Sequence, residues 1–587
     1  MNDVWRERQS FRVFLLAAAL LLWAIVVGLT GGFFFSIGPL RVSSRGMRNA
    51  LIGCSLCIAM AWALAPPGRR RKIFLEVVGR LTSPLAAAAT AIDRRVRTRL
   101  MDTLTVAIAV AVIGVGITKG SFVAGGSDSY GYVSQAHRWV TGTLRVEPSL
   151  DVTLPDNLSH RIFVPLGYRL GSDGRASVPT YAPGFPLQMA LFERVAGPNA
   201  VFYVMPLLAG VTILATYLMG IAVAGRVVGL LASGFMAMSP TFVFQLTHAP
   251  MSDIAAACWW TLALVLLPRG SRVAALVMGL CVALAIATRP NLAPLAIVPG
   301  AWLLREVVTS ASRGLPVTRL VLYAIGPVSA SLFIAGLNRY LYGSVAESGY
   351  GALAGELFRW SYFWPNIVNY SRSLLTTQTP GVVLALAGPV LAWSPLALAY
   401  VLFVVVIYLC YAVYLPMEVW WGLRFFLPVF PIMFVFLSVA VVRLPAYLPV
   451  GTRVLCSIVI AALMYSGANG FMRDMGALDS SAERRFADIG RYVADALPSD
   501  AVLFAVLHSG SAMHYSGRVT IRYDELAPEQ FMALASQLRQ RGHPLFILLD
   551  EVEREDFARR FGPATSLATR DARAAKLVPA VDLYQMH

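Results

Sequence analysis

The chain is built from long apolar runs separated by short polar connections. A transmembrane helix needs about 20 mostly apolar residues, and about 13 runs approach that length. They lie near 11–35, 49–66, 103–123, 199–222, 227–246, 254–268, 273–289, 291–305, 319–337, 381–394, 396–415, 425–443 and 454–470. The pattern therefore predicts an α-helical polytopic membrane protein.

Two longer polar regions interrupt this pattern. Residues 124–198 follow the third run and predict a large first outer loop. Residues 473–587 alternate strand-like and helical stretches, which predicts a small α/β domain. The strand-like stretches are 501–507, 544–549 and 576–584, and the helical ones are 482–497, 528–541 and 551–561. We therefore expect three parts: two N-terminal transmembrane helices with a basic loop over 1–100, a transmembrane core over 101–472, and the α/β domain over 473–587.

Composition excludes a typical water-soluble enzyme. Hydrophobic residues make up 57% of the 587 residues and charged residues 14%, whereas an ordinary soluble domain has about 25% charged residues. The formal charge is +17, from 49 Lys and Arg against 32 Asp and Glu. In a soluble protein such an excess could indicate nucleic acid. Here the basic residues concentrate in short loops, so we interpret them as a topology signal and expect no nucleic-acid partner.

The basic residues predict the orientation in the membrane, because cytoplasmic loops carry an excess of Arg and Lys. Nine basic residues fall between Arg69 and Arg99. Other short loops carry Arg226, Arg269, Arg272, Arg305, Arg313, Arg319 and Arg443. A cytoplasmic N-terminus and an odd number of crossings place all these loops inside. We therefore expect a multi-pass protein of the inner (plasma) membrane with an extracytoplasmic (periplasmic) C-terminal domain.

An acidic residue stands directly beyond the third apolar run. Asp128 follows Gly125 and Gly126 and precedes a helix-like stretch rich in aromatic residues, among them Tyr130. Aspartate in this position commonly serves as the N-cap of the helix that follows. A positioned carboxylate can also act as a general base. The residues alone leave both roles open.

The end of the same loop carries a proline-containing segment that runs into the next span: Tyr181-Ala182-Pro183-Gly184-Phe185-Pro186. Together with the early acid, this arrangement resembles the polytopic glycosyltransferases of the GT-C class, which include the protein O-mannosyltransferases and the lipid A aminoarabinose transferases. By this resemblance Asp128 matches the catalytic aspartate of the class. The chain departs from these subfamilies at Ser129, where a second acid often stands, and at Ala182, where relatives of the aminoarabinose transferase carry lysine.

Two further segments on the same predicted face match the class. The first, residues 248–253, ends in Asp253 at the outer end of a span, where members of the class often place another aspartate. The resemblance makes Asp253 a second catalytic candidate, with the N-cap role again as the alternative. The second, residues 416–428, resembles the late loop of these enzymes, in which an Arg-Phe pair opens a span. Here that pair is Arg424 and Phe425.

Arginines on this face are the predicted phosphate ligands. Arg424 suits this role because a planar guanidinium donates two charge-assisted hydrogen bonds to phosphate oxygens. Its alternative role is snorkelling to the interface. Arg289 is a second candidate, because ionisable groups near membrane depth are costly and more often functional. Tyr130, Glu418 and His248 are candidate substrate contacts.

The resemblance also implies a reaction. The donor would be a polyprenyl-phosphate-linked sugar held in the membrane lipid, and the acceptor a hydroxyl of a glycan, lipid or protein on the extracytoplasmic face. Asp128 would accept the hydroxyl proton, and Arg424 would stabilise the leaving phosphate. Direct displacement would invert the anomeric carbon. No cofactor is expected. Carboxylates at Asp128 and Asp253 are compatible with a divalent cation, but nothing in the sequence requires a metal.

Two other functions compete with glycosyl transfer. A polytopic transporter or lipid flippase would also be rich in spans, but such proteins often contain repeated halves, and no convincing repeat is visible here. A scaffold that recruits a partner through its terminal domain would leave the acids and arginines of one face unexplained. Glycosyl transfer is therefore favoured, while the sugar, the acceptor and the lipid length are not indicated.

Overall fold

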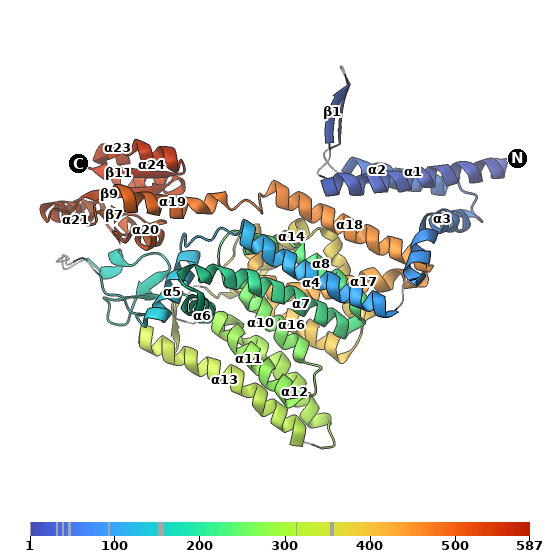
Figure 1. Ribbon diagram of the computed structural model, residues 1–587, viewed down its shortest axis with the longest axis horizontal. Coiled ribbons are helices and arrows are strands. Elements are labelled where there is room, and N and C mark those ends of the chain that lie inside the picture. Colours follow the sequence, from blue (N-terminus) through green and yellow to red (C-terminus); the bar gives the residue numbers. More distant parts are fainter. Residues whose placement is uncertain are drawn as a thin grey trace.

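The structure is a computed structural model that describes residues 2–30, 33–37, 40–44, 48–91, 94–148, 150, 158–312, 314–352 and 357–587. The molecule is elongated and mostly helical, with its two termini toward opposite ends (Figure 1). The long helix α18 (Val450–Asp474) joins the helical bundle to a C-terminal domain at one end. The same end of the bundle carries α5 (Asp128–Thr141) and α6 (Gly184–Ala196).

The N-terminal part consists of three helices and a hairpin. Helices α1 (Asn2–Thr30) and α2 (Arg48–Leu64) contact each other, and the antiparallel strands β1 (Phe33–Ile37) and β2 (Leu40–Ser44) connect them. Helix α3 (Arg70–Ala91) contacts α1 and α18. The basic segment that the sequence predicted as a loop is therefore largely helical. Part of the first apolar run, residues 31–32, lies outside the described residues.

Within the described part of the chain, 7 helices are long and apolar enough to cross a membrane. They are α4 (Arg94–Lys119), η2 with α7 (Pro198–Ala224), η3 with α12 (Pro290–Thr309), α13 (Gly314–Tyr342), α16 (Pro395–Ala412), η6 with α17 (within Trp420–Ala446) and α18. Two bent pairs raise the number to as many as 9. These are α8 (Arg226–Ala237) with α9 (Pro240–Thr247), bent by 54°, and Trp360–Thr377 with Pro380–Leu391, bent by 108°. The chain is a multi-pass membrane protein, as predicted.

Some predicted spans form shorter helices. The runs near 254–268 and 273–289 become α10 (Asp253–Leu266) and α11 (Arg272–Thr288), of 14 and 17 residues. An apolar run of about 10 to 14 residues is as suited to a buried core helix as to a span. Helix α10 is indeed almost entirely buried. The predicted total of about 13 spans is therefore not confirmed.

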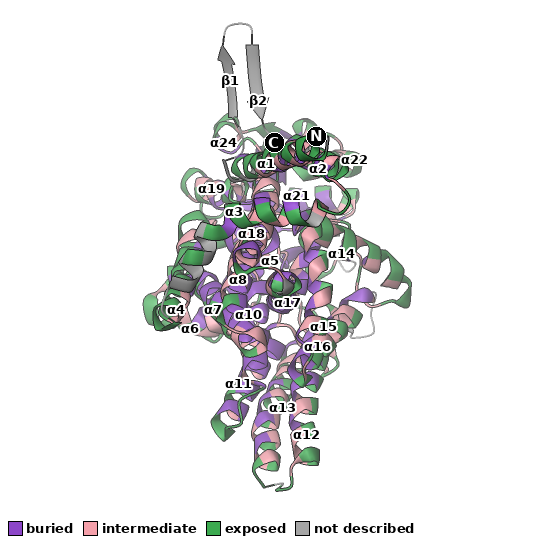
Figure 2. Cartoon of the chain, turned by 90° about the vertical axis from the view of Figure 1, so that its right-hand side faces the viewer, coloured by how far each residue is buried: buried purple, intermediate pink, exposed green. Residues whose placement is uncertain are grey.

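The core of the bundle surrounds α17 (Phe430–Arg443), whose residues are nearly all buried. It contacts α7 (Val204–Ala224), α8 and η5 (Pro380–Ala387). A helix that is apolar on every side has no surface suited to water and becomes the centre of a bundle. Figure 2 shows this distribution, with buried residues gathered on the central helices and exposed residues on the peripheral ones.

Two loop regions cover the end of the bundle that carries α5. The first contains α5, η1 (His160–Phe163), the antiparallel hairpin of β3 (Tyr168–Leu170) with β4 (Ser177–Pro179), and α6. The second contains the hairpin of β5 (Glu347–Ser348) with β6 (Gly351–Ala352) and η4 (Trp360–Tyr362). The bent pair that follows, α14 (Phe363–Thr377) with η5 and α15 (Gly388–Leu391), packs along η6 and α17. Helices α5 and α6 pack against each other.

The C-terminal residues form a five-stranded sheet in the order β10-β11-β9-β7-β8, covered by helices. Its strands are β7 (Val502–Phe504), β8 (Val519–Ile521), β9 (Leu545–Asp550), β10 (Ala568–Arg570) and β11 (Val581–Met586). Its helical elements are α19 (Ser481–Ala496), α20 (Ser509–Ser516), η8 (Tyr523–Glu525), α21 (Pro528–Gln540), η9 (Glu551–Glu553), α22 (Arg554–Phe561), α23 (Ala564–Leu567) and α24 (Ala572–Leu577). The three predicted helical stretches correspond to α19, α21 and η9 with α22. The last predicted strand begins later than expected, because residues 572–577 form α24.

Candidate active site

A tight turn presents Asp128 as the first residue of α5. Gly126 has a φ of +57°, in the left-handed region that glycine adopts without strain. Gly125 lies so close to the C-terminal domain that an added Cβ would stand 2.5 Å from the Phe486 ring. The two glycines noted in the sequence thus allow the chain to turn beneath that domain and enter α5.

The carboxylate of Asp128 has two kinds of partner. Tyr181 donates from its hydroxyl to Oδ1 at 2.6 Å, while Nη1 and Nη2 of Arg424 each lie 3.3 Å from Oδ2. Burial and the neighbouring Asp128 raise the pKa of Tyr181, so this phenol keeps its proton and donates it. A carboxylate offers about four lone-pair positions. Asp128 therefore retains capacity to accept a hydrogen bond from a substrate hydroxyl.

A second ion pair, formed by Asp253 and Arg289, lies near the first and is more deeply buried. Asp253 is the first residue of α10, and Nη2 of Arg289 donates to its Oδ1 at 2.5 Å. Nη1 of Arg289 donates to the Tyr411 hydroxyl at 3.0 Å. Asp253 Oδ2 and Arg289 Nε are buried and have no hydrogen-bond partner among the described residues. Asp253 and Arg289 are thus committed to each other inside the protein.

Three side chains join the two pairs. Tyr132 lies one helical turn after Asp128 on α5, so the two residues share a face of that helix. The Tyr132 hydroxyl is 2.9 Å from Oγ of Ser252, the residue before Asp253. The ring of Phe425 lies against both arginines, with its centroid 5.1 Å from Cζ of Arg289 and 5.3 Å from Cζ of Arg424. Segments distant in sequence therefore converge on one charged cluster.

The two pairs differ in accessibility. The Asp128 side chain is 32% exposed, whereas that of Asp253 is 1% exposed. The 3.3 Å separation between Arg424 and Asp128 is longer than the 2.7 to 2.9 Å of a well-formed charge-assisted bond. The Asp128 carboxylate is therefore partly accessible to solvent, and another ligand can replace its contact with Arg424. The pair of Asp253 with Arg289 is closed.

The structure also bears on the alternative roles of these residues. Ser127 and Ser252 occupy the N-cap positions of α5 and α10, and neither helix has a side-chain capping bond. Both aspartates lie in the first helical turn, where the helix dipole favours an anion. The Arg424 guanidinium contacts Asp128 and the Met251 sulfur, 2.7 Å from Nη1. Capping does not account for the aspartates, and snorkelling to the interface does not account for Arg424.

The three candidate substrate contacts lie outside this cluster. Tyr130 is buried and packs on Tyr168, with ring centroids 5.8 Å apart. His248 stacks on Phe244 at 3.8 Å. Glu418 is exposed just before η6 (Trp420–Val429). These contacts give Tyr130 and His248 packing roles, and a part in substrate binding stays a prediction for all three.

The sequence analysis assigned no role in the site to four members of the cluster: Tyr132, Tyr181, Tyr411 and Phe425. Two of them carried a usable signal. Tyr132 is four residues after Asp128, the spacing that places side chains on one helix face, and Tyr181 opens the proline-containing segment. Tyr411 lies within an apolar helix, where nothing in the local sequence distinguishes it from a lipid-facing tyrosine.

The carboxylates considered for a divalent cation, Asp128 and Asp253, each pair with an arginine. Among the described residues, no group of three or more His, Cys, Asp or Glu side chains could hold a metal ion. The arrangement instead offers an accessible carboxylate beside a guanidinium at the mouth of a helical bundle. In such a site the carboxylate can accept a proton, and the neighbouring guanidinium can bind an anion.

The many-span bundle, the early outer loop with its juxtamembrane helices and the helical late loop together form a GT-C-like membrane fold. One solved structure of similar fold supports this description. ArnT from Cupriavidus metallidurans in the apo state matches with a TM-score of 0.51 and 13% sequence identity, over 83% of this chain and 98% of that chain.

Two other solved structures show weaker likeness. ArnT from Cupriavidus metallidurans bound to undecaprenyl phosphate has a TM-score of 0.46 and 13% identity, over 82% of this chain and 97% of that chain. The Archaeoglobus fulgidus oligosaccharyltransferase tethered to an acceptor peptide has a TM-score of 0.47 and 11% identity, over 79% and 72%. No family model matches the sequence, and neither does any curated protein. At these identities the likeness establishes the fold alone.

Proposed function

We propose that this protein is an integral-membrane glycosyltransferase. It moves a sugar from a polyprenyl-phosphate-linked donor to an acceptor hydroxyl on the extracytoplasmic face of the inner membrane. The observation that carries this proposal is the accessible pair of Asp128 with Arg424, at the end of the bundle covered by the two loop regions. The proposal of this lipid carrier is supported by the fold shared with ArnT, a protein also solved bound to undecaprenyl phosphate.

Asp128 is the proposed general base. An acceptor hydroxyl is a weak nucleophile at neutral pH, and a positioned carboxylate accelerates its attack by about 10²- to 10⁴-fold. The hydroxyl oxygen forms a bond to the anomeric carbon as the bond from that carbon to the phosphate oxygen breaks. The proton passes to Asp128, and the bonding electrons leave with the polyprenyl phosphate. A single displacement of this kind inverts the anomeric centre.

Arg424 is the proposed ligand of the donor phosphate. Its terminal nitrogens approach Asp128 at a distance that leaves them free to turn toward an incoming anion. Charge developing on the leaving phosphate would then meet a guanidinium in a largely desolvated site, where such stabilisation is strongest. Arg289 has a different proposed role. Because its guanidinium is held by Asp253 and Tyr411, it fixes the position of Phe425 and of the neighbouring Arg424 without binding the phosphate itself.

The test is sugar transfer by the purified full-length protein in liposomes, with a panel of polyprenyl-phosphate sugars as donors. Asp128→Asn keeps the size of the side chain but removes its basicity, so turnover should fall by about 10²- to 10⁴-fold with little change in the KM for donor. Arg424→Gln should raise that KM. Asp173→Asn is the matched control, because Asp173 also lies in the first outer loop and pairs with an arginine, Arg145, at 2.6 Å.

Wild-type turnover in Asp128→Asn would reject Asp128 as the base. An unchanged KM for donor in Arg424→Gln would remove that residue from the phosphate site. If the wild-type protein transferred no sugar from any donor of the panel but moved the lipid-linked sugar across the liposome membrane, the enzyme assignment itself would be replaced by the transporter alternative.

A further inference from the structure

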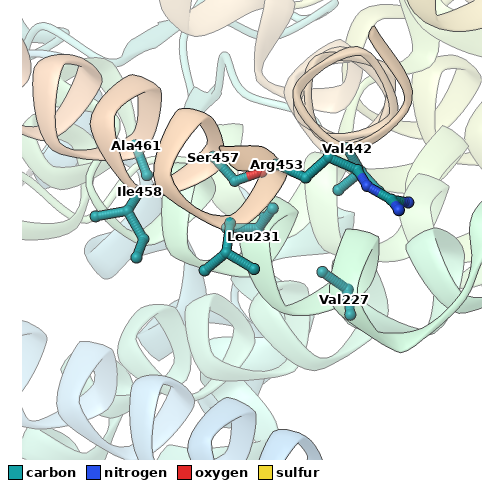
Figure 3. Close-up of a pocket in the computed structure, with 8 residues that line it drawn as sticks. Val227, Leu231, Val442, Arg453, Ser457, Ile458 and Ala461 are labelled. Atoms are coloured by element: carbon teal, nitrogen blue, oxygen red, sulfur yellow. The ribbon is translucent and has the colours of Figure 1, made fainter. Parts of the chain in front are cut away.

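An open groove lies between three helices at the end of the bundle opposite to Asp128. Figure 3 shows its walls, with Val227 and Leu231 on α8, Val442 on α17, and Arg453, Ile458 and Ala461 on α18. The cavity has a volume of about 430 Å³. Apart from Arg453 and Ser457, its lining is aliphatic. The groove therefore combines one cationic side chain with an apolar wall.

The position of the groove along the membrane follows from α18. This helix ends at Asp474 beside the C-terminal domain, and at 1.5 Å per residue Arg453 lies about 30 Å away from that end. This distance matches the hydrocarbon thickness of a bilayer. Helix α8 begins at Arg226 and α17 ends at Arg443 at the same level. The groove thus opens in the leaflet that does not contain the proposed donor site.

The arginines near the groove differ in their hydrogen-bond and ion-pair partners. Arg226 pairs with Asp102 at 3.3 Å, and Arg443 donates to the Leu391 carbonyl. Arg453 is half-buried, its Nε is buried without a hydrogen-bond partner, and no acidic or carbonyl partner of its side chain is found among the described residues. A guanidinium in this environment gains from an anionic ligand, because a buried polar group without a partner is costly.

We propose that this groove binds an anionic glycerophospholipid. The phosphate lies at Arg453, and an acyl chain follows Leu231, Ile458 and Ala461. Basic pockets between transmembrane helices are suited to lipid head groups, and a guanidinium matches phosphate geometry. A soluble anion would leave the apolar wall uncovered, and a neutral lipid would leave Arg453 without a counter-charge. The bound lipid would hold α8, α17 and α18 together at the end remote from the C-terminal domain.

The test is native mass spectrometry of the purified full-length protein in detergent, titrated with phosphatidylglycerol, phosphatidylcholine or undecaprenyl phosphate. The wild-type protein should bind phosphatidylglycerol saturably and more tightly than phosphatidylcholine. Arg453→Gln should weaken this binding by about ten- to a hundredfold, as expected for loss of a charge-assisted contact. Arg305→Gln is the matched control, because Arg305 is an exposed arginine predicted on the same face but outside the groove.

A second variant separates the groove from general surface charge. Ala461→Trp fills the apolar wall while keeping Arg453, so it should also weaken binding of phosphatidylglycerol. Wild-type affinity in either Arg453→Gln or Ala461→Trp would overturn the proposal, as would an equal loss in Arg305→Gln. Stronger competition at this site by undecaprenyl phosphate than by phosphatidylglycerol would assign the groove to the lipid carrier instead. Failure of sugar transfer would leave the lipid measurement unaffected.

Discussion

At the scale of single residues, Asp128 and Asp253 show which roles the local sequence can predict and which it leaves undecided. Each stands just beyond an apolar run or begins a helix, and each was open to a capping or an active-site role. In the structure both meet arginines, but Asp253 is closed off by Arg289 while Asp128 keeps one side open. Solvent access separates the two acids, and access depends on packing from segments that are remote in sequence.

This contrast predicts different costs of removing each acid. Asp253→Ala leaves Arg289 buried beside an empty space, and breaking a buried pair in this way costs about 3 to 5 kcal/mol. Asp128→Ala should cost less than Asp253→Ala, because the Asp128 side chain is 32% exposed and lies 3.3 Å from Arg424, so water can take its place beside the guanidinium. Thermal unfolding of the purified variants in detergent measures the difference. The double variant Asp253→Leu with Arg289→Met removes both charges and should regain most of the lost stability. Equal destabilisation by the two single variants would contradict this division.

At the scale of elements, the C-terminal domain braces the helix that carries Asp128. The Ser509 hydroxyl of α20 accepts a hydrogen bond from the Leu166 amide at 3.1 Å, and Tyr515 accepts one from the Ala124 amide at 2.8 Å. Gly510 faces the ring of Tyr130 on α5. The sequence predicted both a helix after Asp128 and a small α/β domain. It could not predict their contact, because hydrophobic periodicity identifies an apolar face but not the element that covers it.

Gly510→Ala tests this brace. The added Cβ would lie 2.1 Å from Cδ1 of Tyr130, so α20 and α5 must separate, and displacement of a catalytic group by about 1 Å can reduce turnover by about 100-fold. We expect a lower kcat with an unchanged KM for donor in the transfer assay. Adding Tyr130→Ala removes the obstructing ring and should restore part of the turnover. Gly470→Ala is the control, since no atom lies within 4 Å of the Cβ it would add. Full activity in Gly510→Ala would show that the domain contact does not position Asp128.

At the scale of the whole molecule, the charged cluster and the C-terminal domain share one end of the bundle (Figure 1). Ends of spans meet the domain there. Ser480 donates to the Lys119 carbonyl at 3.0 Å, and Thr247 donates to the Ala477 carbonyl at 2.8 Å. Because cytoplasmic loops carry the excess of Arg and Lys, the basic N-terminal segment and the short arginine-bearing loops at the other end predict that the site faces away from the cytoplasm.

Reporter fusions measure this orientation directly. Alkaline phosphatase, which is active only outside the cytoplasm, should be active when joined after His587, while a fluorescent protein joined there through the same export route should be dark. Truncated fusions in the loop at Arg269 should show the reverse pattern. An inactive phosphatase after His587 together with an active one at Arg269 would invert the topology and move the proposed donor site to the cytoplasmic face.

The sequence by itself determined the multi-pass membrane class, and it singled out as site candidates the four charged residues that the structure brings together. The membrane class follows from composition and periodicity, whereas Asp128, Asp253 and Arg424 were selected by the resemblance to the GT-C class. Only the tertiary structure decided how the charges pair, that the basic N-terminal loop is largely helical, and that Tyr181, Tyr132 and Tyr411 complete the cluster. The physical reason is that burial and pairing depend on which distant segments pack together.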